Sequence, residues 1–224
     1  IPFVSKAIGL PLAKIASKTM IGKSLKQQKI KNPSNLNHFS VKEAVLPFDR
    51  FQNVDPILGP EMKSTGEVMG IGTSFAEAYD KSQISSGTII PDGGSVFLSV
   101  RENDKPHLKE LATRLDQLNL SIVATKGTAR EIQSMGIKAR IINKVAEGRP
   151  HVVDLIKNNE ISLLINTTEG KESIQDSSSI RRTALDNKIP CTTTLQGGLA
   201  ICEVLEKRLD WSVQNIQDIH KSIE

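Results

Sequence analysis

The sequence has few aromatic residues, few cysteines and no long hydrophobic run. Phe, Trp and Tyr together make up 4% of the 224 residues, and only Cys191 and Cys202 carry thiols. Two cysteines are too few for a disulfide scaffold or a multi-cysteine zinc site, which favours a reducing compartment. No apolar run approaches the roughly 18 residues that a transmembrane helix needs, so we expect no membrane segment.

The start of the chain also lacks two familiar features. It has no basic stretch followed by an apolar stretch and a small-residue cleavage site, so no secretory signal is visible. Its first residue is Ile1 rather than Met, which leads us to expect a piece of a longer chain. The length is compatible with one large domain or two small ones.

Acidic residues are absent from the first 42 positions, although the whole chain has a formal net charge of only +4. A basic block of this kind can bind nucleic acid. It lacks the interleaved aromatics and arginines that stack on bases or read them, so we favour a solvated or interface face and expect no nucleic-acid partner. The block contains eight lysines: Lys6, Lys14, Lys18, Lys23, Lys26, Lys29, Lys31 and Lys42.

The first part of the chain has an irregular, α+β pattern. Helical pieces are predicted within 2–26, broken at 9–11 and ending near 22, and a loop over 27–38. Strands are predicted at 41–46 and 67–72, with a turn-rich stretch at 55–60. A helix over 74–84 should begin at a capping box of Ser74 and Glu77.

A glycine- and serine-rich linker at 85–94 precedes a regular alternation of strands and helices. We therefore divide the chain into domains 1–93 and 94–224. Strands alternating with helices predict an α/β fold with a parallel sheet covered on both faces, in a three-layer, Rossmann-like arrangement. The predicted strands are 96–100, 121–124, 137–142, 161–165 and 190–193, and the predicted helices are 105–118, 128–135, 152–157, 178–187 and 195–207.

Small polar residues and lysines recur where these predicted strands end. The carboxyl ends of parallel strands share one edge of the sheet, where such folds bind ligands. Thr125 and Thr128 also open a helix, whose free N–H groups and dipole favour an anion. Simple N-capping would explain two threonines but not four strand ends, so we predict phosphate binding. The set consists of Ser99, Lys105, Thr125, Gly127, Thr128, Lys144, Asn166, Thr167 and Thr168.

Several catalytic signatures are missing from the sequence. There is no Walker lysine motif, and Phe75 stands where a dinucleotide fingerprint beginning at Gly70 needs its third glycine. The four histidines share no metal-ligand spacing, so we expect no metal site in this chain. His151 is expected to cap a helix, and Cys191 and Cys202 to be buried small hydrophobes. The second domain is therefore expected to bind a ligand without catalysing a reaction.

Eight segments resemble the carbamoyl-phosphate synthase large-subunit family, in order along essentially the whole chain. They are Pro2–Ala7 (PFVSKA), Pro11–Lys14 (PLAK), Ser40–Glu43 (SVKE), Asp55–Glu67 (DPILGPEMKSTGE), Asn143–Val145 (NKV), Glu147–His151 (EGRPH), Ile165–Thr168 (INTT) and Ile180–Leu185 (IRRTAL). The resemblance implies that 1–93 end the second ATP-grasp unit and that 94–224 form a methylglyoxal-synthase-like regulatory domain.

The same resemblance implies the chemistry of the whole enzyme. That enzyme makes carbamoyl phosphate from bicarbonate, glutamine-derived ammonia and two MgATP, for pyrimidine and arginine synthesis. It uses Mg or Mn together with K, and it acts with a small glutaminase subunit. The family's ATP and metal ligands are expected upstream of Ile1, so this chain would hold no cofactor and no catalytic residue of its own.

Effector sites follow from the resemblance residue by residue. UMP or IMP phosphate is expected at Lys105, Thr125, Thr128 and Lys144, with Ser99 nearby. The sugar and base are expected at Asn166, Thr167, Thr168 and Asp176.

Ornithine is expected at Glu43, the Leu46 carbonyl and Thr193. The flank departs from the family pattern at Cys191 and Thr192, where a tyrosine and an aspartate are expected. An ornithine held by both Glu43 and Thr193 would tie the two domains together, and we expect that interface to be the two-state element of regulation.

Two further expectations complete the sequence-based picture. The full protein should be cytoplasmic, or plastid in a plant or alga, and should form a homo-oligomer through its regulatory domain. The alternative is a free-standing methylglyoxal synthase-like enzyme with a phosphate ligand, although its acidic motifs are not evident.

Overall fold

The fold is described from a computed structural model, for residues 1–31, 36–45, 66–167, 177–208, 210–221 and 223. The chain forms two compact units, which we describe separately. The first comprises Ile1–Ala44, Glu67–Ser86 and Arg208–Glu224, and the second comprises Val45–Gly66 and Gly87–Lys207. Within the described part of the chain, no helix has the length and apolar character that crossing a membrane requires.

The second unit is built on a five-stranded parallel sheet, which confirms the predicted fold class. Its strands are β3 (Ser95–Ser99), β4 (Ser121–Thr125), β5 (Arg140–Ile142), β6 (Leu163–Asn166) and β7 (Cys191–Thr192). Their order across the sheet is β5-β4-β3-β6-β7. From β3 the chain winds outward through β4 to β5 and then returns to β6 on the other side of β3. The topological switch point therefore lies between β3 and β6.

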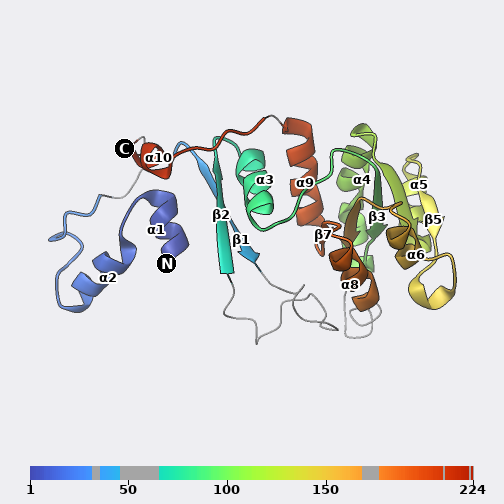
Figure 1. Cartoon of the computed structure of the whole chain (residues 1–224), viewed down its shortest axis with the longest axis horizontal. Coiled ribbons are helices and arrows are strands. Elements are labelled where there is room, and N and C mark those ends of the chain that lie inside the picture. The colour runs from blue at the N-terminus through green and yellow to red at the C-terminus, as the bar shows by residue number, and fades with distance from the viewer. Residues whose placement is uncertain (32–35, 46–65, 168–176, 209, 222, 224) are drawn as a thin grey trace. The chain divides into compact units, whose positions relative to one another are not determined.

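Helices cover both faces of this sheet (Figure 1). They are α4 (Leu108–Gln117), α5 (Lys126–Ser134), α6 (Val152–Lys157), α8 (Ser178–Asp186) and α9 (Leu195–Lys207), with short 3-10 helices η2 (Glu102–His107) and η3 (Val145–Glu147). One core cluster joins Phe97 and Leu164 of the sheet to Ile156 of α6 and Ile180 of α8. On the other face, a methyl group placed on Gly198 of α9 would lie 2.9 Å from Ile165 and 3.1 Å from Leu111 of α4. The sheet side chains alternate between these two layers, as the pleat requires.

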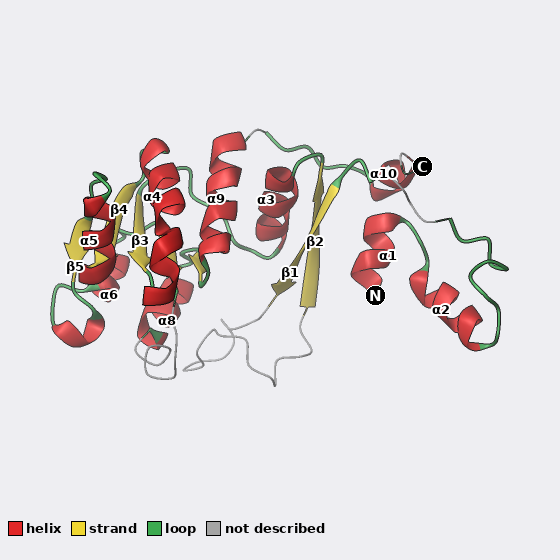
Figure 2. Ribbon diagram, turned by 180° about the vertical axis from the view of Figure 1, so that it is seen from behind, coloured by secondary structure: helices red, strands yellow, loops and turns green. Residues whose placement is uncertain are grey.

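The first unit is a mixture of short helices and a two-stranded sheet (Figure 2). It contains α1 (Pro2–Ile8), α2 (Leu12–Met20), β1 (Phe39–Val45), β2 (Gly66–Gly72), α3 (Phe75–Ser85) and α10 (Ile216–Lys221). The predicted cap of α3 is present in part, because the Ser74 hydroxyl accepts a hydrogen bond from the Glu77 N–H. The Glu77 carboxylate accepts instead from the N–H and hydroxyl of Thr73.

Residues from Arg208 onward group with the first unit, although they follow the last helix of the second. Asp80 of α3 is 2% exposed and accepts hydrogen bonds from Arg208 (2.9 Å) and from the indole N–H of Trp211 (2.7 Å). His220 of α10 lies 2.5 Å from the Lys6 carbonyl of α1, and the two helices are side by side in both views. These contacts hold the C-terminal segment on the first unit. The division of the chain into domains 1–93 and 94–224 stays a prediction.

Most predicted elements are found, although several begin at other residues: α4 starts at Leu108 rather than at 105, and β5 at Arg140 rather than at 137. The helix predicted over 128–135 is α5, which begins at Lys126 with Thr125 as its N-cap. The expectation that Thr128 opens this helix is therefore wrong, because Thr128 lies inside the helix and its hydroxyl accepts a hydrogen bond from the Val100 N–H. The helix α10 was not predicted, since only one short turn of apolar spacing marks it.

Candidate functional site

The candidate site is the carboxyl edge of the sheet around the switch point. Ser99, at the end of β3, is in register with Asn166, at the end of β6. Neighbours in register point to the same face of a sheet. On the other side of β3, the Thr125 hydroxyl lies 3.4 Å from the Ser99 hydroxyl. The structure thus brings together three of the residues that the sequence assigned to one site.

Two threonine hydroxyls fix the loop that follows β3. Thr128 accepts a hydrogen bond from the Val100 N–H, and Thr167 accepts one from the Arg101 N–H, both at 3.0 Å. Thr128 is 1% exposed and Thr167 is 5% exposed. Because a buried N–H without an acceptor is costly, these hydroxyls hold the loop firmly. The loop leads directly into η2, which carries Lys105.

An anion-binding position lies where α5 begins. The N-cap Thr125 makes no side-chain capping hydrogen bond, so its side chain leaves the first-turn N–H groups of the helix uncapped. A methyl group placed on Gly127 would lie 3.5 Å from Lys105 Nζ. A lysine ammonium therefore lies beside the positive end of the helix dipole, an arrangement that suits a phosphate oxygen.

Carboxylates from η2 share this edge of the sheet. Lys105 Nζ lies 2.5 Å from the Glu102 carboxylate. The Arg101 guanidinium donates to both oxygens of Asp104, at 2.8 and 3.1 Å. These two hydrogen bonds, with a further one from Thr167, hold the pKa of Asp104 below its usual range.

The Asn166 side chain carries an unused donor. The residue is 1% exposed, and among the described residues its amide nitrogen has no hydrogen-bond partner. A buried polar group is normally paired, so an unpaired one calls for an explanation such as a ligand or a water. Asn166 lies at the switch point, in register with Ser99.

Lys144 lies on the same edge but is separated from this group along the sheet. It follows β5, two residues beyond Ile142, which is in register with Thr125. The residue is exposed, and its backbone N–H donates to the Glu147 carboxylate at 3.0 Å. Thr168, Asp176 and Leu46 lie outside the described residues, so their predicted roles stay predictions.

Glu43 lies on β1, in the first unit. Its carboxylate accepts a hydrogen bond from the Gln83 amide at 3.1 Å, and burial raises its pKa. Burial together with the nearby Glu43 charge raises the pKa of Tyr79 to about 12. Within the described chain, no lysine or arginine side chain pairs with Glu43, which leaves the carboxylate open to a cationic ligand.

Thr193 is exposed and follows β7 in the second unit. Because Glu43 belongs to the other unit, a joint role for the two residues stays a prediction.

The expectation that both cysteines are buried is right for Cys202 and wrong for Cys191. Cys202 is fully buried, and burial raises its pKa to about 11. Cys191 is exposed, because β7 is a two-residue strand at the edge of the sheet with a neighbour on one side only.

Among the residues that the structure describes, no three His, Cys, Asp or Glu side chains form a group that could hold a metal ion. His151 caps α6, as expected: its backbone N–H donates to Asp154 at 3.0 Å, and its Nδ1 lies 3.3 Å from the same carboxylate. It is 8% exposed rather than on the surface, since it bridges to Asn143 beside the sheet.

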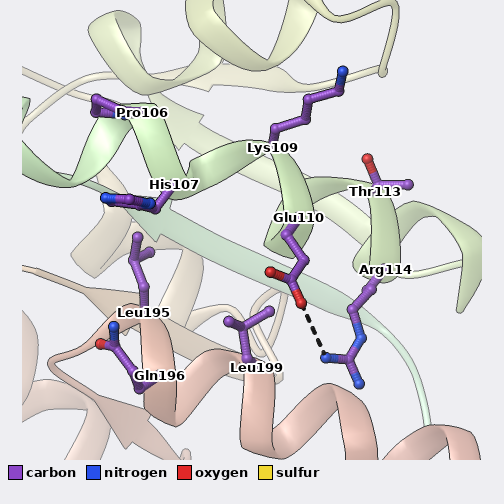
Figure 3. Close-up of a pocket in the computed structure, with 9 residues that line it drawn as sticks. All are labelled: Pro106, His107, Lys109, Glu110, Thr113, Arg114, Leu195, Gln196 and Leu199. Atoms are coloured by element: carbon purple, nitrogen blue, oxygen red, sulfur yellow. Dashed lines mark ion pairs between the residues drawn. The ribbon is translucent and has the colours of Figure 1, made fainter.

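A cavity of about 580 Å³ lies between α4 and α9 and contains none of the predicted site residues. Figure 3 shows Leu195 and Leu199 of α9 facing His107 and Glu110 across it, with an ion pair between Glu110 and Arg114. It is lined by Pro106, His107, Lys109, Glu110, Thr113, Arg114, Leu195, Gln196 and Leu199.

The sequence pattern missed the acidic members of the site. Glu102 stands three residues before Lys105 and pairs with it, and Asp104 stands three residues after Arg101 and pairs with that residue and with the Thr167 hydroxyl. Their proximity to Lys105 in the sequence was a usable signal, because residues three apart meet on a helical turn.

The MGS-like domain family matches residues 107–193. Along all 224 residues the chain is 54% identical to the carbamoyl phosphate synthase large chain of Pseudomonas putida, 55% identical to that of Pseudomonas aeruginosa and 47% identical to that of Vibrio cholerae. It spans 21% of the length of each of these relatives.

A crystal structure of methylglyoxal synthase from Elizabethkingia anophelis matches 53% of this chain and 81% of its own, with 14% identity and a TM-score of 0.43. The identity with the large chains extends over both units, including the segments that the MGS-like family does not match. The chain is therefore similar, over its whole length, to about one fifth of the carbamoyl phosphate synthase large chain, and its residues 107–193 match the MGS-like domain family.

Proposed function

We propose that this chain is the effector-binding, C-terminal part of a carbamoyl phosphate synthase large chain. The observation that carries the proposal is the identity of 47 to 55% along all 224 residues with large chains from several bacteria. In this proposal the first unit belongs to the second ATP-grasp region and the second unit is the regulatory domain. The chain spans about a fifth of those relatives, so the activity of the whole enzyme is part of the proposal.

The second unit would bind the phosphate of UMP or IMP at the carboxyl edge of its sheet. Three features support this site: the first turn of α5, which its N-cap side chain leaves uncapped, Lys105 beside Gly127, and the buried amide nitrogen of Asn166, which has no hydrogen-bond partner within the described part of the chain. The helix end and the ammonium supply positive potential for a phosphate, while the amide offers a donor to a sugar or base oxygen. Ser99, Thr125 and Lys144 would complete the set.

The first unit would contribute Glu43 to a site for ornithine. A half-buried carboxylate that has no cationic side chain among its described partners gains from a cationic ligand. The Gln83 amide fixes one carboxylate oxygen, which orients Glu43 toward a single binding geometry. Leu46 and Thr193 would complete that site.

The whole enzyme would make carbamoyl phosphate from bicarbonate, glutamine-derived ammonia and two ATP, in the cytoplasm and together with a small subunit. It would depend on Mg or Mn and on K. We assign no step of that reaction to the residues of this chain, whose role here is to bind effectors. Association of the chain into a homo-oligomer is a further part of the proposal, which light scattering with and without effector tests.

Calorimetry of the 224-residue chain against UMP, IMP, ornithine and inorganic phosphate tests the proposal. We expect at least one nucleotide to bind at or below millimolar concentration, and Lys144→Ala to weaken it tenfold or more, because it removes a cation from a charge-assisted contact. Lys138→Ala is the matched control: Lys138 is also exposed, but it precedes β5 and so lies at the opposite edge of the sheet. Failure of UMP and IMP to bind would overturn the effector assignment.

Two other outcomes would point to other functions. Formation of methylglyoxal from dihydroxyacetone phosphate would favour a free-standing synthase. Binding of nucleic acid with a steep salt dependence would favour a role for the lysine block instead.

A further inference from the structure

The charge balance at the proposed phosphate site is unusual for a site that binds an anion. Lys105 lies beside the first turn of α5, where a methyl group placed on Gly127 would be 3.5 Å from its Nζ, and its side chain is only 19% exposed. Its ammonium contacts the Glu102 carboxylate at 2.5 Å, although that residue is 84% exposed and projects from the same short helix. The Glu102 carboxylate therefore already pairs with the Lys105 ammonium that a phosphate would have to contact.

A second carboxylate of η2 also pairs with a nearby cation. Asp104, also on η2, binds the Arg101 guanidinium through both oxygens and accepts a hydrogen bond from Thr167. Thr167 and Thr128 in turn hold the loop that carries η2. The carboxylates of Glu102 and Asp104 therefore pair with basic and hydroxyl side chains at the edge of the sheet where Ser99, Thr125 and Asn166 meet.

We infer that Glu102 is an internal counter-anion, which holds Lys105 in the absence of effector and is displaced when a nucleotide phosphate binds. The inference rests on the proposed function of this edge. The two carboxylates differ in how easily they can leave. Asp104 is fixed by a bidentate contact with Arg101 and by a hydroxyl, whereas Glu102 pairs only with Lys105 among the described residues and its side chain is 84% exposed. Glu102 can therefore swing into solvent at little cost, while Asp104 stays in place.

Displacement has a thermodynamic consequence. An exposed ion pair contributes little to stability, so Glu102 lowers the affinity for phosphate without abolishing it. It also disfavours weak, singly charged anions, which gain less from Lys105 than a dianionic phosphate does. Glu102 would thus tune the site toward phosphate esters rather than toward chloride or simple carboxylates.

The test compares the nucleotide affinity of Glu102→Gln with that of the unchanged 224-residue chain and of Glu110→Gln. All three are titrated with UMP, IMP and inorganic phosphate. Glu110 lies on the adjoining α4, is 67% exposed and faces Arg114 at 3.8 Å, so its substitution removes the same charge without touching Lys105. We expect Glu102→Gln to tighten binding about two- to fivefold and Glu110→Gln to leave it unchanged within experimental error.

A second measurement follows Lys105 directly. Lysines labelled by reductive methylation with carbon-13 give separate resonances, and the Lys105 signal is assigned with Lys105→Arg. We expect this signal to shift when Glu102 is replaced by Gln, and to shift again when phosphate is added to that variant, because the phosphate then supplies the anion that Glu102 no longer provides. Glu102→Ala provides a second variant with the same expected shift, and its exposed position makes loss of folding an improbable complication.

The outcomes separate the two proposals. If the unchanged chain binds no UMP, IMP or phosphate, the proposed function fails and the inference fails with it. If the chain binds but Glu102→Gln binds no tighter, or if Glu110→Gln tightens binding equally, the counter-anion role is wrong while the effector site stands. Tighter binding by Glu102→Gln alone, with the shifted Lys105 signal, supports the inference.

Discussion

At the scale of single residues, Asp80 connects the C-terminal segment to the first unit. Its carboxylate is 2% exposed and accepts from Arg208 and from Trp211, which is the one tryptophan of the sequence. Removing one partner of a buried ion pair leaves the other without compensation and costs about 3 kcal/mol. We expect Asp80→Ala to lower the free energy of unfolding by that amount, measured by Trp211 fluorescence in urea.

Asp218→Ala is the matched control for this experiment. Asp218 also pairs with a basic residue of the C-terminal segment, Lys221 at 2.7 Å, but its side chain is 64% exposed. An exposed pair of this kind contributes at most about 1 kcal/mol. Equal effects of the two substitutions would show that Asp80 is not an anchor.

At the scale of secondary-structure elements, Gly70 lets β2 and α3 approach closely. A methyl group on Gly70 would lie 1.9 Å from the Ala78 carbonyl oxygen and 2.5 Å from the Ser82 nitrogen. These are backbone atoms of a helix and cannot move aside independently, so overpacking here costs about 3 kcal/mol or more. We expect Gly70→Ala to unfold the first unit at a markedly lower urea concentration.

Gly66, on the same strand, offers the comparison. A methyl group there would meet Val45 at 3.5 Å, which is an ordinary contact. Gly66→Ala should change the urea midpoint little, and a loss of stability as large as that of Gly70→Ala would contradict the packing argument.

The ion pair between α4 and α9 predicts a dependence on pH. Arg114 donates to both oxygens of Glu206 at 2.7 Å, which lowers the pKa of Glu206. A lowered pKa means that the native state holds the charged carboxylate, so its stabilising effect is full above the ordinary pKa near 4.5 and is lost as the pH falls through the lowered value. Glu206→Gln should therefore reduce the free energy of unfolding by about 1 kcal/mol at pH 7.

The difference between the two proteins should shrink as the pH falls below 4.5, and urea titrations at pH 7, 5 and 3.5 measure it. Glu110→Gln, which removes the longer contact to the same arginine, serves as control. A difference that is independent of pH would assign the effect to packing rather than to charge.

At the scale of the whole molecule, the two units differ greatly in apolar burial. Among the described residues, the first unit contributes only Ala7, Ile15, Ala76 and Ala78 to the buried hydrophobic set, whereas the second supplies its large aliphatic side chains and Phe97. Burial of apolar surface is the main source of stability. The first unit should therefore unfold at a lower urea concentration than the second.

Two probes separate these transitions. Trp211 belongs to the first unit, while far-ultraviolet circular dichroism is dominated by the larger second unit. We expect the fluorescence midpoint to precede the dichroism midpoint. Nucleotide at about 100 times its dissociation constant should stabilise only the later transition, by about 2.7 kcal/mol. Coincident midpoints, both shifted equally by nucleotide, would mean that the units unfold as one.

Much of this architecture could be predicted from the sequence, because its signals are local. Alternating apolar strands and amphipathic helices predicted the parallel sheet, and its edge was predicted to gather Ser99, Thr125 and Asn166. The helix start at Lys126 could not be predicted in the same way. Thr128 has the residue type of a helix N-cap, yet its hydroxyl accepts a hydrogen bond from the N–H of Val100, which is distant in the sequence. Only the folded sheet creates this contact.

The sequence by itself determined the fold class, the position of the polar edge and the relationship to the large chain, since periodicity and residue type are carried by neighbouring residues. Tertiary structure alone decided which groups meet across long separations. It left the Asn166 amide nitrogen without a hydrogen-bond partner among the described residues, put Lys105 beside Gly127 and Glu102, and returned residues after Lys207 to Asp80 of the first unit. Those arrangements depend on strand order and helix packing, which set distances between residues that no local pattern relates.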